Sequence, residues 1–357
     1  MEKKVVKTIA IMITLCSAFF CMALWYMPKI HAQEIAGNEE QAVELDAKAG
    51  DTKTDLIQKE DTTEENVKDS FTQQLRIQLP PGDSQSNVTI KNDYVTQTID
   101  ITIPGADENY LYQYPMVGKC NNIDNMTFES ESGSGTLEIN LDKVFELSTT
   151  YADNYLYIDF LSPHQVYKKV VVIDAGHGGD MPGAYIHGSY EKDIDLAIAM
   201  QLKQIFAQST DKSIGVYFTR SDDSNPSFEE RVGLANKTDA DLFISIHNNS
   251  TVSGQMSSIN GTTVMYDEAK EDTGHGTKEF AQICVNQMSD ILQSRNRGIV
   301  AGHDIYIIRN STVPVALIEV GFMTNQKELK ELNSTDYQKI AAQGIYNSIE
   351  EAFQEGF

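Results

Sequence analysis

Two histidines and one glutamate follow apolar runs of the kind that form buried strands. His177 stands in a glycine-rich stretch after VVVID, His247 follows LFISI, and Glu319 ends VALIE. Because the carboxyl ends of parallel strands meet at one edge of a sheet, we expect these three side chains to lie close together. Two histidines and one carboxylate are a common ligand set for catalytic zinc, which keeps one position open for water. A second carboxylate near that water would supply a general base, so the pattern predicts metal-assisted hydrolysis.

The candidates for the two carboxylates differ in their surroundings. Glu191 begins a predicted helix that is reached from the His177 loop, and Asp193 and Asp195 compete with it for the same role. Glu191 also has a purely structural explanation, because an acidic side chain stabilises the N-terminus of a helix. Glu319 lies in the almost wholly apolar run VPVALIEVGF, where a carboxylate is costly unless it meets a cation or takes part in chemistry. The residues alone therefore leave the choice among the helix carboxylates open.

The glycines around His177 allow the backbone to come close to another group. They do not form a dinucleotide-binding loop, because Met181 stands where G-x-G-x-x-G needs its last glycine, and no GK[ST] follows. The sequence contains no H-E-x-x-H motif, and its four cysteines form no C-x-x-C pair that would suggest a thiolate zinc site. Among the other histidines, His187 is the best spare ligand, since it lies between His177 and Glu191.

From Lys168 onward, strand patterns alternate with helix patterns. This order predicts an α/β domain with a mostly parallel sheet and helices on both faces. The apolar residues of the first helix recur on one face, at Ile194, Ile198, Leu202 and Ile205. Strands are predicted at KKVVVID, IGVYFTR, LFISIH, GTTVMY and VPVALIEV, and helices over Glu191–Gln208, Phe228–Asn236, Thr277–Ser294 and Tyr337–Phe353.

The region before this domain has the pattern of a small all-β sandwich. LRIQL, NVTIKN, TQTIDITIP, TLEINL and NYLYIDFL alternate apolar and polar residues, and turn sequences such as PPGD separate them. Tyr110, Tyr112 and Tyr114 in NYLYQYP are expected to alternate onto one face. Packing between strands explains them better than a surface for stacking sugars.

The N-terminus indicates export. Lys3, Lys4 and Lys7 precede an uncharged run of about bilayer length, Thr8–Met27, which fits an uncleaved anchor or a signal cleaved after Ala32. Both interpretations place the rest of the chain outside the membrane. The formal net charge of −24 argues against a nucleic-acid partner. The predicted division is 1–32 anchor or signal peptide, 33–70 acidic disordered linker, 71–167 β-sandwich and 168–357 catalytic domain.

Together these residues resemble the zinc-dependent N-acetylmuramoyl-L-alanine amidases of the type-3 group. The resemblance covers about Lys168 to Phe353, with the motifs in the family's order. The matching stretches are VVIDAGHGG, PGA, EKDIDLAIAMQL, FTRSDD, ERVGLAN, ADLFISIHNN, RG and VPVALIEVGFMTN.

The resemblance implies roles for four residues. His177, Glu191 and His247 correspond to the family's zinc ligands, and Glu319 corresponds to its catalytic carboxylate. The implied substrate is peptidoglycan, cut at the amide between the lactyl group of N-acetylmuramic acid and L-alanine of the stem peptide. The N-terminal lysines and apolar run predict the place of action, which is the outward face of the cell membrane or, after secretion, the cell wall. Whether a protein activator is needed stays open.

Other features of the family are less well matched. The β region resembles the AMIN-type wall-targeting domains found beside such amidases, although no diagnostic motif supports this. The stretch from Ser250 to Gly276 is short and polar, with no clear room for the inhibitory helix that some relatives insert.

Two alternative functions remain open. One is a catalytically inactive amidase fold that binds cell wall or activates another hydrolase, and the other is a zinc hydrolase that cuts a peptide bond of the wall. The complete set of four residues argues against the inactive protein.

Overall fold

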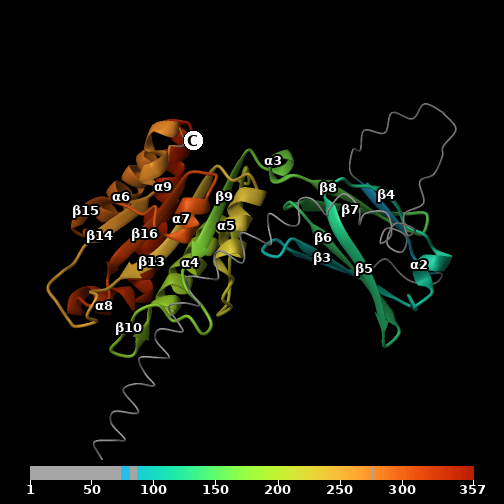
Figure 1. Cartoon of the computed structure of the whole chain (residues 1–357), viewed down its shortest axis with the longest axis horizontal. Helices are drawn as coiled ribbons and strands as arrows, with labels where there is room; N and C mark the ends of the chain where they lie inside the picture. The colour runs from blue at the N-terminus through green and yellow to red at the C-terminus, as the bar shows by residue number, and fades with distance from the viewer. Residues whose placement is uncertain (1–73, 81–86, 275) are drawn as a thin grey trace, which may run out of the picture. The chain divides into compact units, whose positions relative to one another are not determined.

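The computed structural model describes residues 74–80, 87–274 and 276–357 (Figure 1). The predicted anchor or signal peptide, 1–32, and the predicted acidic linker, 33–70, lie outside the described residues. Among the helices of the described part, none has the length and apolar character needed to span a bilayer.

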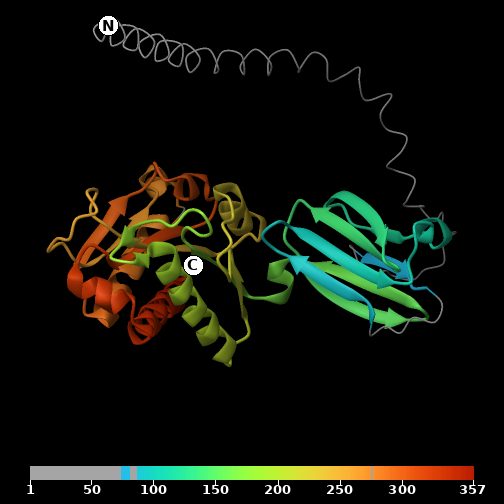
Figure 2. The ribbon, with the colours of Figure 1, turned by 90° about the horizontal axis from the view of Figure 1, so that it is seen from below.

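The β region folds as two antiparallel four-stranded sheets packed face to face (Figure 2), which confirms the predicted sandwich. Alternate residues of both sheets, such as Ile77 and Ile158 from one and Ile101 and Ile139 from the other, share one core. One sheet has the order β4 (Val117–Lys119), β1 (Gln74–Gln78), β8 (Tyr155–Leu161) and β7 (Glu146–Ala152). The other has the order β2 (Thr89–Asp93), β3 (Thr98–Pro104), β6 (Ser134–Leu141) and β5 (Ile123–Glu131).

The expectation that three tyrosines share one face of a strand is wrong. NYLYQYP forms a single helical turn, α2 (Tyr110–Gln113), after a turn in which the Asp107 carboxylate accepts a hydrogen bond from the Asn109 backbone N–H. The helical period turns the side chains apart, so Tyr110 is buried while Tyr112 is 93% exposed. The Tyr110 ring stacks on Phe128 in the sandwich core, with 5.7 Å between centroids, and its hydroxyl donates to the backbone.

The C-terminal region is built on one six-stranded sheet. Four strands are parallel, as predicted, but the last two in the spatial order run the other way, so the sheet is mixed. The reversed direction of these two strands was not predicted, because the apolar pattern of a buried strand does not show which way the strand runs. The spatial order is β12 (Ile214–Phe218), β9 (Lys169–Ala175), β13 (Leu242–Asn249), β16 (Val315–Phe322), β14 (Thr262–Tyr266) and β15 (Asn296–Ala301).

Helices cover both faces of this sheet, as predicted. Val171 and Ile173 of β9 belong to one buried cluster with apolar residues of α4 (Glu191–Gln208), α6 (Thr277–Leu292) and α9 (Thr335–Glu355). Val170 and Val172 point to the opposite face, where α5 (Phe228–Lys237) and α7 (Tyr306–Asn310) pack. The remaining short elements are α3 (Pro163–Val166), the hairpin of β10 (Tyr185–Ile186) and β11 (Ser189–Tyr190), the 3₁₀ helix η2 (Glu268–Thr273) and α8 (Gln326–Leu332).

Helix α4 presents its first residue to the edge of the sheet. Ile194, Ile198 and Leu202 are buried against the sheet, and each contributes roughly 1.5–3 kcal/mol by leaving water. Glu191 and Asp193 fill its first turn, where acidic side chains favour the positive end of a helix. The packing of this apolar stripe therefore fixes where the Glu191 side chain lies.

The stretch between β13 and α6 contains β14 and the 3₁₀ helix η2. Leaving aside residue 275, the structure shows no α-helix between Ser250 and Gly276. This agrees with the expectation that the stretch leaves no room for an inserted helix.

Candidate active site

The sheet brings the ends of three neighbouring strands to one edge. β9, β13 and β16 lie side by side and run parallel, and His247 of β13 is directly opposite Glu319 of β16. His177 lies two residues beyond the end of β9. The expected convergence at the carboxyl ends of the strands is therefore observed.

Two imidazole nitrogens point at one oxygen of Glu191. The distance from His177 Nε2 to Glu191 Oε1 is 3.0 Å, and the distance from His247 Nδ1 to the same oxygen is also 3.0 Å. The two rings meet edge to face, with centroids 4.8 Å apart. Glu191 is nearly buried, and its other oxygen, Oε2, accepts the backbone N–H of Ala184 at 2.8 Å.

These donors fit a zinc ion by their chemistry and their closeness. Ligand atoms of His177, Glu191, Asp195 and His247 all lie within 4.8 Å of one another. Imidazole nitrogen and carboxylate oxygen are both ordinary zinc ligands. The hydrogen bonds and charges of the two histidines outweigh burial and lower the pKa of Glu191 well below its usual range, so this carboxylate is ionised.

Glycine is needed at two backbone positions that lie against the side chains of this cluster, Gly176 and Gly183. A Cβ at Gly176 would overlap the His247 ring. A Cβ at Gly183 would lie 2.6 Å from both Glu191 Oε2 and His177 Cδ2, and Gly183 has a φ of +67° that side chains rarely adopt. His177 itself has a φ of 58°, in the left-handed region. The glycines of the loop thus let the backbone pass directly behind the three side chains.

Asp195 belongs to the cluster but differs from Glu191 in its contacts. It lies one helical turn after Glu191 and is fully buried, and its Oδ1 accepts a hydrogen bond from Asn248 Nδ2 at 2.7 Å. Burial and the negative charge of Glu191 raise the pKa of Asp195 well above its usual value. Glu191 is the better candidate for the anionic ligand of the two, because it contacts both histidines directly.

Two other sequence candidates lie away from the cluster. Asp193 is exposed on α4, and His187 is exposed in the turn between β10 and β11. Of the carboxylates that competed for the role of Glu191, only Asp195 among the described residues comes close to the histidines.

Glu319 has the surroundings of a group that exchanges protons. Its Oε2 is buried and has no hydrogen-bond partner among the described residues. Burial and the charge of Glu191 raise the pKa of Glu319 to about 7, against the opposing effect of His247. A carboxyl with a pKa near 7 can both accept and return a proton at neutral pH.

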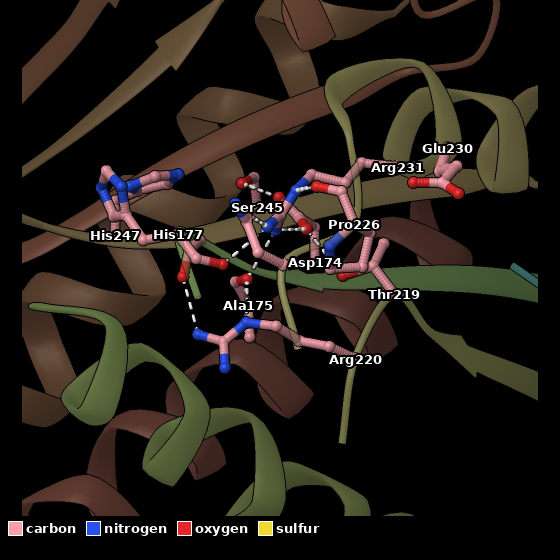
Figure 3. Close-up of polar contacts among 12 residues, drawn as sticks. Asp174, Ala175, His177, Thr219, Arg220, Pro226, Glu230, Arg231, Ser245 and His247 are labelled. Atoms are coloured by element: carbon pink, nitrogen blue, oxygen red, sulfur yellow. Dashed lines mark hydrogen bonds and ion pairs between the residues drawn. The ribbon is translucent and has the colours of Figure 1, made fainter. Parts of the chain in front are cut away.

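A buried ion pair lies beneath the His177 loop (Figure 3). Arg231 Nη1 donates to Asp174 Oδ1 at 2.7 Å, and both side chains are almost fully buried. Asp174 also accepts hydrogen bonds from Ser245 Oγ at 2.6 Å and Thr219 Oγ1 at 2.7 Å. Burial would raise the pKa of Asp174, but Arg231 and the two hydroxyls outweigh it and lower this pKa, so the pair is ionised.

Two guanidinium groups bind three consecutive carbonyls of the loop (Figure 3). Arg231 donates to Ala175 O at 2.8 Å and to His177 O at 2.6 Å. Arg220 donates to Ala175 O at 2.8 Å and to Gly176 O at 2.7 Å. These bonds fix the backbone that carries His177. Sequence reasoning assigned no role to either arginine, although both stand in the quoted stretches FTRSDD and ERVGLAN, and Arg231 interrupts a buried helix face.

Replacing Arg231 with alanine should lower the free energy of unfolding by about 3–5 kcal/mol, because it leaves Asp174 charged and buried without its cation. Urea unfolding followed by circular dichroism measures this loss. Lys327→Ala is the control, since Lys327 is 80% exposed in its pair with Glu331 and should contribute less than about 1 kcal/mol. Equal losses in the two variants would contradict a structural role for the buried pair.

Comparison with known proteins identifies the family of this region. The family N-acetylmuramoyl-L-alanine amidase (Amidase_3) matches residues 171–351. The uncharacterized protein YqiI of Bacillus subtilis (strain 168) is 37% identical over 187 residues, which are 52% of this chain and 86% of YqiI. The germination-specific N-acetylmuramoyl-L-alanine amidase of the same organism is 30% identical over 201 residues, covering 52% of this chain and 81% of the relative.

Longer relatives and solved structures also match about half of the chain. N-acetylmuramoyl-L-alanine amidase LytC of Bacillus subtilis (strain 168) is 32% identical over 182 residues, which are 51% of this chain and 35% of LytC. The catalytic domain of CwlV from Bacillus (Paenibacillus) polymyxa var. colistinus is 36% identical, with a TM-score of 0.47, and covers 52% of this chain and 98% of that domain. Since the family match spans just over half of the 357 residues and includes the whole cluster, the chain belongs to the N-acetylmuramoyl-L-alanine amidase family.

Proposed function

We propose that this peptidoglycan amidase is zinc-dependent, with His177, Glu191 and His247 as the metal ligands and Glu319 as the general base. The observation that carries the proposal is the convergence of both histidines on Glu191 Oε1, each at 3.0 Å. These three ligands would hold the zinc and leave it able to bind water or substrate. The cleaved bond is the amide between the lactyl group of N-acetylmuramic acid and L-alanine.

The protein groups account for the proton movements of this hydrolysis. Bound zinc would polarise the amide carbonyl and lower the pKa of a water molecule. Glu319 accepts a proton as the water oxygen adds to the carbonyl carbon. The C–N bond then breaks, and Glu319 returns the proton to the leaving nitrogen, so the products are the lactyl carboxylic acid and the alanine amine, which become carboxylate and ammonium when the acid's proton moves to the amine. The raised pKa of Glu319, about 7, suits both transfers.

Asp195→Asn is expected to keep zinc bound with less than about a tenfold loss of affinity. Asp195 is held by Asn248, whereas the two histidines contact Glu191. Glu191→Gln, as the matched change, should lower the affinity by more than about 100-fold, beyond the usual effect of a residue that only orients a ligand. Competition with a chromogenic zinc chelator measures both constants. The reverse order of effects would make Asp195 the ligand.

The proposed reaction is tested by digesting purified peptidoglycan with the protein, with and without a zinc chelator, and reading the products by mass spectrometry. Free stem peptides with an L-alanine N-terminus, lost with chelator and restored by added zinc, are the expected result. Stems that stay on the glycan despite bound zinc would contradict catalysis and favour a wall-binding protein. Cuts inside the peptide would instead identify a zinc peptidase.

We also propose that the protein acts in wall remodelling outside the membrane. The support is the substrate, which lies there, and the three lysines before the apolar run Thr8–Met27. Protease treatment of intact protoplasts should remove the catalytic domain of an anchored protein, and a secreted one should appear in the medium. Full protection inside the protoplast would refute this placement.

The resemblance of the β-sandwich to AMIN domains stays a prediction. Binding of residues 71–167 to purified walls would test whether this region targets the wall.

A further inference from the structure

A small cavity lies beside Glu319, on the side of the two reversed strands. Its volume is about 250 Å³, and its walls include Thr263 of β14, Arg297 of β15, and Glu319 and Phe322 of β16. Thr263 is directly opposite Glu319 in the antiparallel pairing of β14 with β16. The cavity therefore adjoins the catalytic edge of the sheet, on the face of Glu319 away from the β9 strand and the His177 loop.

Arg297 brings a positive charge to this cavity. Its guanidinium lies over the Phe322 ring, 5.3 Å from the centroid, and Nη1 donates to Asn260 O at 3.3 Å. Within the part of the chain that the structure describes, no ion pair is formed by Arg297. A guanidinium has five N–H donors in a planar fork that matches a carboxylate, so this side chain keeps donors for a ligand.

The charge of the protein makes this arginine notable. The chain has a formal net charge of −24. A protein of this charge repels an anionic substrate at long range, so a cation is needed where the anionic group binds. Arg297 supplies such a cation at the cavity that Glu319 also lines.

The chemistry of the proposed substrate limits which group can bind there. The carboxyl of the muramic acid lactyl group is consumed in the scissile amide, and the carboxyl of the first alanine is consumed in the next peptide bond. The first free carboxylate must therefore lie further along the stem peptide, on the side of the leaving amine.

We propose that Arg297 and the cavity beside Glu319 form a subsite for a stem-peptide carboxylate, with Phe322 supporting the guanidinium. The inference rests on the proposed reaction and adds its substrate preference. Binding at this subsite places the leaving amine on the β16–β14 side of the cluster and the glycan on the opposite side.

Two matched synthetic substrates test the subsite. Both are N-acetylmuramoyl-L-alanyl-γ-D-glutamyl-L-alanine amide, and they differ only in whether the α-carboxyl of glutamate is free or converted to a carboxamide. The wild-type protein should cleave the free acid with about tenfold higher kcat/KM, as expected for a hydrogen bond between charged groups. Arg297→Gln should bring the ratio of the two kcat/KM values close to one, and Arg297→Lys should restore part of it.

Arg295→Gln is the matched control. It removes the same charge two residues away, from an exposed side chain that does not line the cavity, and should leave the ratio unchanged. Because each ratio comes from one protein sample, partial unfolding of a variant does not alter it. An Arg297→Gln variant with the wild-type ratio, or a wild-type protein with no preference, would overturn the subsite alone. A wild-type protein that cleaves neither substrate nor peptidoglycan would overturn the proposed reaction and the subsite together.

Discussion

Replacing Glu319 with glutamine is expected to lower kcat on peptidoglycan by about 10²–10⁴-fold while zinc stays bound. Glutamine keeps the size of the side chain but cannot accept a proton from water or return one to the leaving amine. The buried Oε2 without a hydrogen-bond partner among the described residues supports a role in proton transfer, because a structural carboxylate would normally be satisfied. Release of stem peptides and zinc content by atomic absorption are the two measurements.

Glu279→Gln is the control for this change, since it makes the same substitution on the exposed surface of α6. It should leave both activity and zinc content as in the wild type. If Glu319→Gln retained more than a tenth of the activity with zinc bound, another group would be the base. If it lost zinc, Glu319 would be a ligand rather than the base.

The parts of the site that could be predicted are those fixed by local sequence. The apolar residues Ile194, Ile198 and Leu202 place one face of α4 on the sheet, and Glu191 begins the helix as the pattern indicates. The run VVVID and its glycines likewise predict a buried strand that ends in a loop. Once the strands are parallel, His177 and His247 must come out at one edge.

The rest of the site depends on contacts between distant segments. Arg220, in the loop after β12, and Arg231 of α5 bind the carbonyls of the His177 loop, and no spacing in the sequence indicates those bonds. The residues alone do not separate Glu191 from Asp195, because both lie on the same helix face; the family resemblance favours Glu191, and the structure adds that Glu191 contacts both histidines while Asp195 is bonded to Asn248.

The misread tyrosine stretch shows the same limit in the β region. NYLYQYP alternates in sequence like a strand, but the turn at Asp107 starts a single helical turn, and the burial of Tyr110 in the sandwich core holds it there. Tertiary packing here overrides an alternating pattern only six or seven residues long.

The reversed direction of β14 and β15 in the catalytic domain also cannot be predicted from local sequence. Because β14 runs antiparallel to β16, Thr263 lies opposite Glu319, and both residues line the cavity beside Glu319.

The largest loss should follow His177→Ala, which is expected to weaken zinc binding by more than about 100-fold and to reduce amidase activity to background. Two protein ligands would remain, one fewer than catalytic zinc sites normally have. Chelator competition measures the affinity, and the peptidoglycan digest measures activity. His187→Ala is the matched control, because this exposed histidine lies between the same glycine loop and α4 and should change neither quantity.

A second variant is needed at His177, because its backbone is in the left-handed region. Its φ of 58° costs alanine of the order of 1–2 kcal/mol, so His177→Ala could lose zinc through a shifted loop rather than through the missing imidazole. Asparagine accepts the left-handed region more readily and keeps the loop in place. Equal loss of zinc in His177→Asn, with an unfolding midpoint like the wild type, would assign the effect to the imidazole. Retention of tight zinc by His177→Asn would instead show that the ligand set is built on Glu191, Asp195 and His247, the other members of the cluster.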